Sequence, residues 1–381
     1  MQGPRRPALA EASIFLGFMN RALKGAALLV SLAIGLESAT RIDEWVRWKT
    51  PLLARAGSVG ELIIVDSTGG RGVPGEQYRQ YAINSDGFRG PRLRPGKQRV
   101  LVVGASETFG LYERAGKEYP RQLQDTLAAA GCNVDVVNSA LPGFSLPTLT
   151  ATYLHRLRGL NAQLVVIYPT PVQYLDYYFP TWEPPLAARG GISSGLRLRS
   201  ARRLRDHLKV ALPQFVQTYL RSIQITASRA SMQTGFMFDT IPADRLEAFR
   251  RDLRLLIDSA KASGSKVIVA THANSFPPGS PVDSARLVAW TKFYPRASMA
   301  VLPAFETAAN RLILEEARLA GVASSDLSTA MAPLDPRTAF ADFSHFSEHG
   351  SAQIAHTLAT DILRAHGCPA PTHATTKAVN H

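Results

Sequence analysis

Arg99-Val-Leu-Val-Val103 runs directly into Gly104-Ala-Ser-Glu-Thr-Phe-Gly110, and this junction decides the fold class. A short continuous apolar run that ends in a glycine turn is typical of a strand buried on both faces of a parallel sheet. A serine at such a strand-to-helix turn presents its hydroxyl at the carboxyl edge of the sheet. There the helix N-terminus offers backbone N–H donors to a developing negative charge. Ser106 is therefore a candidate nucleophile, although such a turn also suits a structural role or phosphate binding.

Strands and helices alternate along the rest of the chain. Further strands are expected at 133–137, 162–168 and 265–271, and a weaker one at 321–323. Apolar residues three or four apart predict helices that begin near Asp244, cover about 302–320, and follow Ser347, an N-cap candidate. This alternation predicts an α/β fold with a parallel sheet covered on both faces. Such sheets bind ligands at the carboxyl ends of their strands.

Two more motifs fall in loops of this predicted fold. Asn138-Ser-Ala-Leu-Pro-Gly143 follows the second strand, and Gly143 could donate its N–H to an oxyanion, although an ordinary Pro-Gly turn has the same sequence. Asp342-Phe-Ser-His345 places a carboxylate three residues before a histidine. Such a carboxylate can hold the imidazole in one tautomer while the ring takes a proton from serine. The alternative is a surface helix cap that contains a histidine.

Together with the lead-in Tyr81-Ala-Ile-Asn-Ser-Asp-Gly-Phe-Arg89, these motifs resemble the SGNH (GDSL-like) hydrolase superfamily, in particular its membrane-anchored bacterial members. The resemblance covers about residues 80–365. It implies a three-layer flavodoxin-like fold with a central parallel sheet of about five strands. It also implies a triad of Ser106, His345 and Asp342, with oxyanion donors at Ser106 and Gly143. A serine nucleophile needs no cofactor, and no metal-ligand cluster is evident, so neither a cofactor nor a metal is expected.

The chain departs from the family pattern at two places. Ala105 stands where an aspartate is usual, a change outside the triad. After the third strand, Tyr168-Pro-Thr-Pro-Val-Gln173 replaces the segment that supplies an oxyanion asparagine, and Pro171 has no N–H to donate. Thr170 is the expected substitute donor, with Gln173 as the other possibility. Losing one such donor typically lowers the rate by about two to three orders of magnitude.

A histidine and an insertion complete the region around the expected site. His272 follows the fourth strand and is expected to be a loop histidine without a catalytic task, with substrate contact as the alternative. The alternation breaks over about 174–242, which predicts a partly helical insertion near the mouth of the site. It carries the basic segment 196–209, which could bind anionic headgroups or an acidic glycan, or could simply form a solvated helix face. Four aromatic residues precede this segment: Tyr177, Tyr178, Phe179 and Trp182.

The first 48 residues are expected to direct the chain to a membrane. Positive residues at 5, 6, 21 and 24 precede the apolar run 25–36, which has 12 residues and is short of the roughly 20 that span a bilayer. Because Glu37 interrupts any cleavage junction, we favour an uncleaved anchor over a removed signal sequence. Trp45 and Trp48 suit a separate juxtamembrane helix at the interface. The alternative is a buried hydrophobic N-terminal helix.

Domain boundaries follow from these features. The expected parts of the 381-residue chain are an anchor and juxtamembrane helix (1–48), a lead-in (49–97), a hydrolase-like domain (98–367) and a disordered tail (368–381). Two cysteines, Cys132 and Cys368, cannot form a four-ligand zinc site. They are expected to be unlinked thiols, although export would permit a disulfide.

The net charge of +13 lies largely near the N-terminus and in 197–209. No zinc-finger spacing, RNA-binding signature or phosphate loop accompanies it, so nucleic-acid binding is not expected. The predicted function is a serine esterase or deacylase that works through an acyl-enzyme on an ester of a cell-surface glycan or lipid. Its expected place is the periplasmic side of a bacterial inner membrane, or outside the cell after cleavage. An O-acyltransferase and a non-catalytic acyl-glycan-binding protein are the alternatives.

Overall fold

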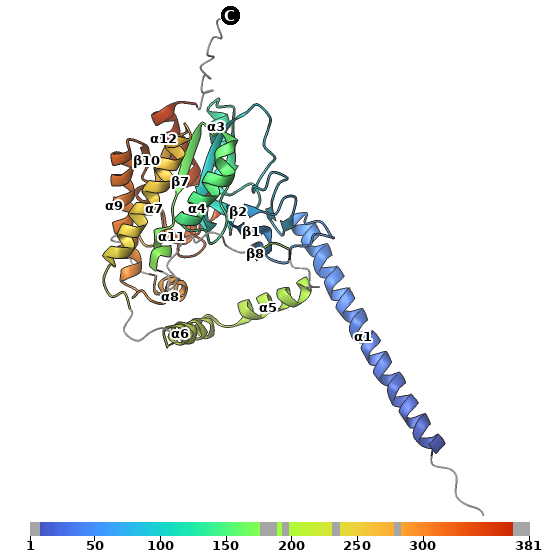
Figure 1. Cartoon of the computed structure of the whole chain (residues 1–381). Helices are drawn as coiled ribbons and strands as arrows, with labels where there is room; N and C mark the ends of the chain where they lie inside the picture. The colour runs from blue at the N-terminus through green and yellow to red at the C-terminus, as the bar shows by residue number, and fades with distance from the viewer. Residues whose placement is uncertain (1–7, 176–188, 193–197, 231–236, 278–282, 369–381) are drawn as a thin grey trace, which may run out of the picture.

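A five-stranded parallel sheet forms the centre of the molecule (Figure 1). The computed structural model describes residues 8–175, 189–192, 198–230, 237–277 and 283–368. The sheet has the order β10-β9-β7-β5-β6. Its strands are β5 (Gln98–Gly104), β6 (Val134–Asn138), β7 (Leu164–Tyr168), β9 (Lys266–Ala270) and β10 (Ala323–Ser325). All five expected strands are confirmed, and their order is that of flavodoxin-like folds.

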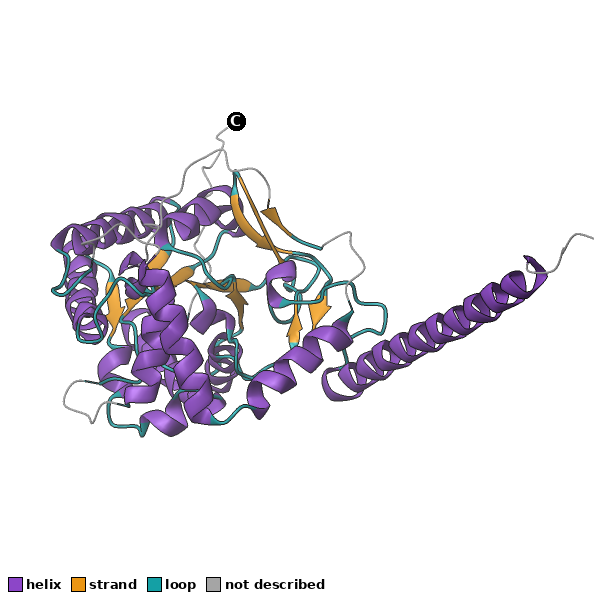
Figure 2. Ribbon diagram, turned by 90° about the horizontal axis from the view of Figure 1, so that it is seen from below, coloured by secondary structure: helices purple, strands orange, loops and turns teal. Residues whose placement is uncertain are grey.

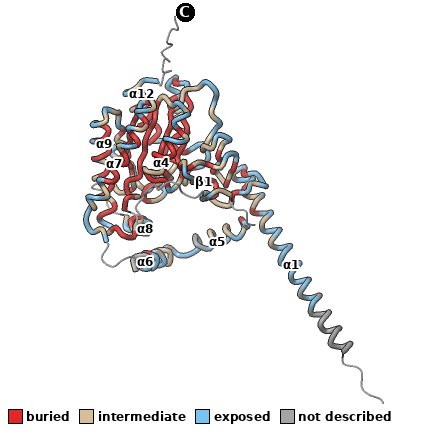
Figure 3. Tube along the Cα trace, in the orientation of Figure 1, coloured by how far each residue is buried: buried red, intermediate tan, exposed pale blue. Residues whose placement is uncertain are grey.

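Both faces of the sheet are buried, as the continuous apolar runs predict. Leu101 and Val103 of β5 belong to one hydrophobic core, while Val100 and Val102 belong to the other. The first core is shared with α4 (Leu146–Thr152), α7 (Ala243–Ala262) and α9 (Val301–Ala320), and the second with α3 (Tyr119–Ala129) and α12 (Glu348–His366). The sheet therefore lies between two helical layers, and Figure 3 shows its strands as the most buried part of the chain.

The three expected helices are confirmed as α7, α9 and α12. Ser347 caps α12, because its hydroxyl accepts a hydrogen bond from the N–H of Gly350 at 3.1 Å. Shorter or peripheral elements make up the rest: α2 (Ser106–Phe109), α8 (Ser284–Phe293), α10 (Leu327–Met331), α11 (Pro336–Ala339), the π-helical η2 (Tyr153–Leu157), and the 3-10 helices η1 (Val59–Leu62), η3 (Arg158–Leu160) and η4 (Pro171–Leu175).

The lead-in 49–97 is part of the domain. Leu62 and Ile83 join the same core as the sheet. An antiparallel sheet pairs β1 (Ile63–Asp66) with β2 (Gly69–Gly72) and with β8 (Arg189–Gly190), which comes from the insertion. A two-stranded sheet pairs β3 (Gln77–Tyr78) with β4 (Tyr81–Ala82).

The insertion contributes two helices in the part of it that the structure describes. They are α5 (Arg199–Ala211) and α6 (Gln214–Ala230), so the expectation of a partly helical insertion is confirmed. The aromatic residues Tyr177, Tyr178, Phe179 and Trp182 lie outside the described residues, as do 369–381 of the expected tail.

A single N-terminal helix, α1 (Ala8–Trp48), leaves the domain as one continuous rod (Figures 1 and 2). Its Leu23–Trp48 portion is long and apolar enough to cross a membrane by length and composition. Leu28 and Leu29 are about 70% exposed (71% and 68%), so the alternative of a buried N-terminal helix is wrong. Ile42, Trp45 and Trp48, the residues of the expected juxtamembrane helix, are helical and belong to the last turns of α1.

A disulfide joins Cys132 to Cys368, with their Cα atoms 5.3 Å apart. The expectation of unlinked thiols is therefore wrong. Helices α3 and α12 lie side by side on one face of the sheet, and each cysteine follows the end of one of them. Residues 236 apart in sequence are thus brought within bonding distance, which no local pattern reveals.

Candidate active site

Ser106 lies where the sequence predicted it, at the first residue of α2 directly after β5. Gly104 makes this turn possible, since an added Cβ would come within 2.1 Å of the Thr108 hydroxyl. The strand order changes direction around β5, so its carboxyl end is a topological switch point at which such folds bind ligands. Ser106 is half-buried at this edge, and its hydroxyl donates to Oε2 of Glu107 at 3.3 Å.

Asp342 holds His345 through both carboxylate oxygens. Nδ1 of the imidazole lies 2.8 Å from Oδ2 and 3.0 Å from Oδ1. The backbone N–H groups of Ser344 and His345 also donate to Oδ1, which fixes the carboxylate in the loop. Nε2 of His345 is buried and has no hydrogen-bond partner among the residues described. The ring is therefore oriented with one nitrogen on a carboxylate and the other available to take a proton.

The charges around His345 favour its protonated form. Burial alone would lower the pKa of this histidine, but the hydrogen bond that it donates to Asp342 and the nearby charge of Glu107 raise it above its usual value. Burial likewise opposes ionisation of Asp342, yet its hydrogen bond with His345 keeps the pKa of the carboxyl below the ordinary value. The pair is thus arranged as a carboxylate beside a relatively basic imidazole.

Glu107 connects the segment of Ser106 to the segment of His345. Its Oε2 accepts from Ser106, while its Oε1 accepts from the hydroxyl of Ser344 at 3.2 Å. The ring of Tyr112 also lies 5.3 Å from the ring of His345, between centroids. Two segments more than 230 residues apart in sequence therefore meet at one edge of the sheet. Within the described part of the chain no hydrogen bond joins Ser106 to His345, because the serine hydroxyl is turned to Glu107.

Behind Glu107 lies a buried chain of charges. His272 is fully buried, with Nδ1 at 2.7 Å from Glu306 and Nε2 at 3.7 Å from Glu107. Although burial opposes the charge, the two carboxylates raise the pKa of His272 to about 10. Burial also opposes ionisation of Glu107, but the adjacent His272 and the positive charges of both histidines lower its pKa to about 2. His272 lies in the loop after β9, as the sequence suggested, and it is a buried cation between two carboxylates.

The expected oxyanion donors Thr170 and Gly143 lie in different surroundings. Thr170 follows β7 and donates its hydroxyl proton to Oε2 of Glu107 at 3.2 Å. Pro171 and Gln173 belong to the 3-10 helix η4. Gly143 is exposed and has φ of 81°, the left-handed conformation of a turn glycine. Its N–H as an oxyanion donor stays a prediction.

Sequence analysis missed Glu107 and Glu306. Glu107 had a visible signal, since it is an ionisable residue directly after the nucleophile in an otherwise uncharged motif. Glu306 had none, because one glutamate on an amphipathic helix resembles an ordinary solvent-facing residue.

Among the residues that the structure describes, no group of three or more His, Cys, Asp or Glu side chains could hold a metal ion.

No protein-family model matches the chain, and no curated protein matches it. Several solved structures are similar at low identity. An alpha/beta hydrolase enzyme from the metagenome of Lake Arreo, Spain, is 14% identical, with a TM-score of 0.42 over 72% of this chain and 97% of that one. The lipase/acylhydrolase from Enterococcus faecalis is 16% identical, with a TM-score of 0.41 over 70% and 95%. An acetylxylan esterase from Geobacillus stearothermophilus is 15% identical, with a TM-score of 0.41 over 70% and 94%. These likenesses are distant, so the functional argument rests on the residues of this chain.

Proposed function

We propose that the protein is an SGNH-type serine esterase or deacylase with Ser106 as nucleophile, His345 as general base and Asp342 as its orienting carboxylate. One observation carries the proposal. Asp342 holds Nδ1 of His345, while Nε2 has no hydrogen-bond partner among the described residues. Ser106 lies at the same edge of the sheet, and Glu107 contacts both Ser106 and Ser344, the neighbour of His345. An imidazole oriented by a carboxylate is one of the two contacts that activation of a serine hydroxyl uses, and the proposal adds the second, from Ser106 to His345.

The reaction begins with a rotation of the Ser106 side chain from Glu107 towards Nε2 of His345. Glu107 is a poor base because its pKa is about 2, whereas the raised pKa of His345 suits proton abstraction. The serine oxygen attacks the acyl carbonyl as its proton passes to Nε2. His345 then protonates the leaving alcohol, and water releases the acyl group from the serine by the same route.

The tetrahedral intermediate needs donors for its oxyanion. We assign this role to the backbone N–H groups of Ser106, at the start of α2, and of Gly143. Thr170 joins them only when its hydroxyl leaves Glu107. The negative charge of Glu107 next to the nucleophile also disfavours a second negative charge there, and the cationic His272 behind it offsets that effect.

The proposed location is the periplasmic side of a bacterial inner membrane, with α1 as an anchor, or the exterior if α1 is cleaved. Two features support it: the apolar length of α1 and the disulfide, since disulfides persist in oxidising compartments. At this location an acyl ester of a glycan or a lipid is the proposed substrate.

A fluorophosphonate probe tests the nucleophile. We expect labelling of the full chain, loss of labelling in Ser106→Ala, and strong slowing in His345→Ala. Ser259→Ala, which changes a half-buried serine on α7, is the matched control and should label normally. Absence of labelling in a folded preparation would overturn the esterase proposal. It would favour a non-catalytic acyl-glycan-binding protein, an alternative suggested by Pro171 and the engaged Thr170. Product analysis with an added hydroxyl acceptor separates hydrolysis from O-acyl transfer.

A further inference from the structure

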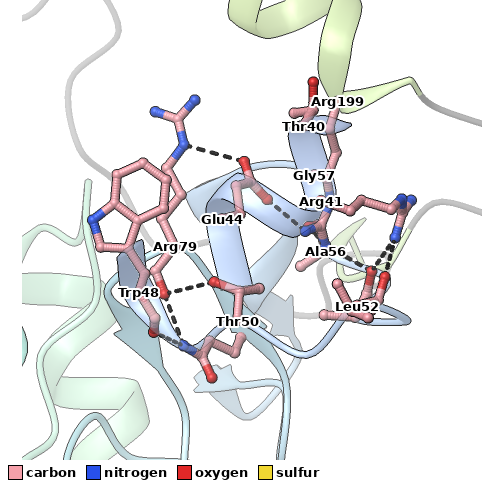
Figure 4. Close-up of polar contacts among 12 residues, drawn as sticks. Thr40, Arg41, Glu44, Trp48, Thr50, Leu52, Ala56, Gly57, Arg79 and Arg199 are labelled. Atoms are coloured by element: carbon pink, nitrogen blue, oxygen red, sulfur yellow. Dashed lines mark hydrogen bonds and ion pairs between the residues drawn. The ribbon is translucent and has the colours of Figure 1, made fainter. Parts of the chain in front are cut away.

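Helix α5 is fixed to the domain end of α1 by a buried ion pair. The Arg199 guanidinium donates to Glu44 at 2.6 Å, and both side chains are at most 3% exposed. The same guanidinium donates to the carbonyls of Ala54 and Ala56, as Figure 4 shows around Glu44. Arg203, one turn further along, pairs with Asp43. Helix α5 therefore leaves the domain beside the point at which α1 leaves it.

The outer sides of α5 and α6 carry two apolar stripes with a spacing of four residues. The first stripe is on α5 and the residue after it, and the second is on α6. Their side chains are 38–74% exposed: Leu204, Leu208, Leu212, Phe215, Tyr219 and Ile223. We call these six residues the α5–α6 apolar surface. Helix α6 also contacts α8, and its Ile225 is buried, so the apolar surface is the side left uncovered. Contiguous apolar exposure of this kind marks a site of protein or membrane contact.

The position of the two helices favours a membrane. Helices α5 and α6 lie across the side of the domain towards which α1 projects (Figure 1), and Figure 3 shows that they are largely exposed. The exposed length of α1 on the same side is the one segment that meets the criteria for a membrane span within the described residues. A bilayer around α1 would therefore lie next to α5 and α6.

The charge of the two helices favours an anionic surface. Their sequences contain seven basic residues (Arg199, Arg202, Arg203, Arg205, Lys209, Arg221 and Arg229) and one acidic residue (Asp206). Arg199 and Arg203 are paired with Glu44 and Asp43 of α1, so five basic residues remain against one acidic residue. A hollow of about 350 Å³ beside α5 is lined by Arg202 and Arg205, together with Gly57, Leu198 and Arg199, and the Arg199 guanidinium is already paired with Glu44. Basic residues beside an apolar stripe are the combination by which interfacial helices bind anionic lipid headgroups.

We propose that α5 and α6 dock on an anionic bilayer, with the α5–α6 apolar surface in the headgroup region and the arginine-lined hollow on lipid phosphates. The proposal rests on the membrane location given above for α1, and it is independent of the hydrolase activity. Docking places the catalytic edge next to the bilayer. Helix α8 contacts α6, its Arg286 donates to the carbonyl of Asp342 at 3.1 Å, and its Trp290 stacks on Phe343 at 5.7 Å.

Depth measurements on the full chain in lipid vesicles test the proposal. An environment-sensitive NBD label is attached to Tyr219→Cys, and a matched control carries it at Leu319→Cys. Leu319 is 51% exposed in the last turn of α9, near the edge of the sheet opposite the catalytic edge. The native cysteines do not compete for the label because they form a disulfide. Vesicles contain phosphatidylcholine alone or mixed with phosphatidylglycerol, with or without doxyl-labelled lipid.

At position 219 we expect a blue shift and quenching by doxyl lipid, both larger with phosphatidylglycerol, and neither effect at position 319. Arg205→Glu should weaken the phosphatidylglycerol effect, whereas Arg318→Glu, with the same change in net charge, should not. Equal behaviour of the two labels in phosphatidylglycerol vesicles would overturn the proposal. A label at Phe215→Cys repeats the measurement if Tyr219→Cys fails to fold. If the esterase proposal fails, fluorophosphonate labelling is absent. If α1 is not a membrane anchor, the protein does not float with neutral vesicles. Both outcomes are distinct from failure of the docking proposal.

Discussion

The hydroxyl of Thr170 donates to Oε2 of Glu107 at 3.2 Å, at the end of the strand where the SGNH pattern places an oxyanion asparagine. The same carboxylate oxygen accepts from Ser106, the nucleophile proposed above. A threonine hydroxyl has one proton to donate, so in this state Thr170 serves the carboxylate and not an oxyanion.

This relationship predicts a mild phenotype for Thr170→Val. The backbone donors remain, and only a hydrogen bond to Glu107 is lost, so we expect kcat to fall by less than about tenfold. Steady-state kinetics on a chromogenic ester provide the measurement. A fall of about a hundredfold or more would show that Thr170 turns to the oxyanion during the reaction.

Glu107→Gln is expected to shift the pH profile. The charge of Glu107 helps to raise the pKa of His345, and His345 must be neutral to accept the serine proton. In the wild type, kcat/KM should therefore rise with pH through an apparent pKa above about 6.5, the ordinary value for histidine. Removing the negative charge lowers that pKa, so the rise should move to lower pH in the variant. An unmoved profile would mean that another group controls the reaction.

His272→Gln should destabilise the fold. Two carboxylates would remain buried without their cation, and breaking a buried ion pair typically costs about 3–5 kcal/mol. The pKa of His272 is about 10 in the folded protein, above its unfolded value. Its stabilising contribution is complete below about pH 6.5 and is lost as the pH rises through about 10. Urea unfolding at several pH values should show this decline in the wild type, and a variant with the same decline would contradict the assignment.

A substitution of Glu113 should stabilise the fold, in contrast to His272→Gln. Burial raises the pKa of its carboxyl to about 7, even though Ser351 donates a hydrogen bond to it. Its contribution to stability is therefore complete below about pH 4.5 and is lost as the pH rises through about 7. Glu113→Gln should be more stable than the wild type at about pH 8, by at most about 3 kcal/mol, with little difference at about pH 4.5. Thermal unfolding at both pH values measures the gap, and a gap that does not grow with pH would refute the explanation.

The disulfide predicts a redox dependence of stability. Cys132 and Cys368 close a loop with a sequence separation of 236 residues, and removing a native disulfide typically costs about 2–5 kcal/mol. We expect a reductant to lower the denaturation midpoint of the wild type. The Cys132→Ser/Cys368→Ser double variant should have that lower midpoint already and show no further response to reductant.

The sequence predicts this fold well because its strands are buried on both faces and its helices have one apolar side. The run 99–103 and the cap at Ser347 are local features, and both lie where they were expected. Contacts that depend on the packing of distant elements were missed. Helix α9 brings Glu306 to His272, and the adjacency of α3 and α12 brings Cys132 to Cys368. The partner of a buried charge is set by tertiary packing, and a single sequence does not contain that information.

Helix α1 is unbroken from its apolar length to Glu44, and Glu44 forms a buried ion pair with Arg199. The globular part therefore has no hinge where it joins α1. At the membrane location proposed for α1, such a rod would hold the catalytic edge at a constant height and tilt. Acyl esters that diffuse within the lipid layer would then be the substrates that this geometry serves best.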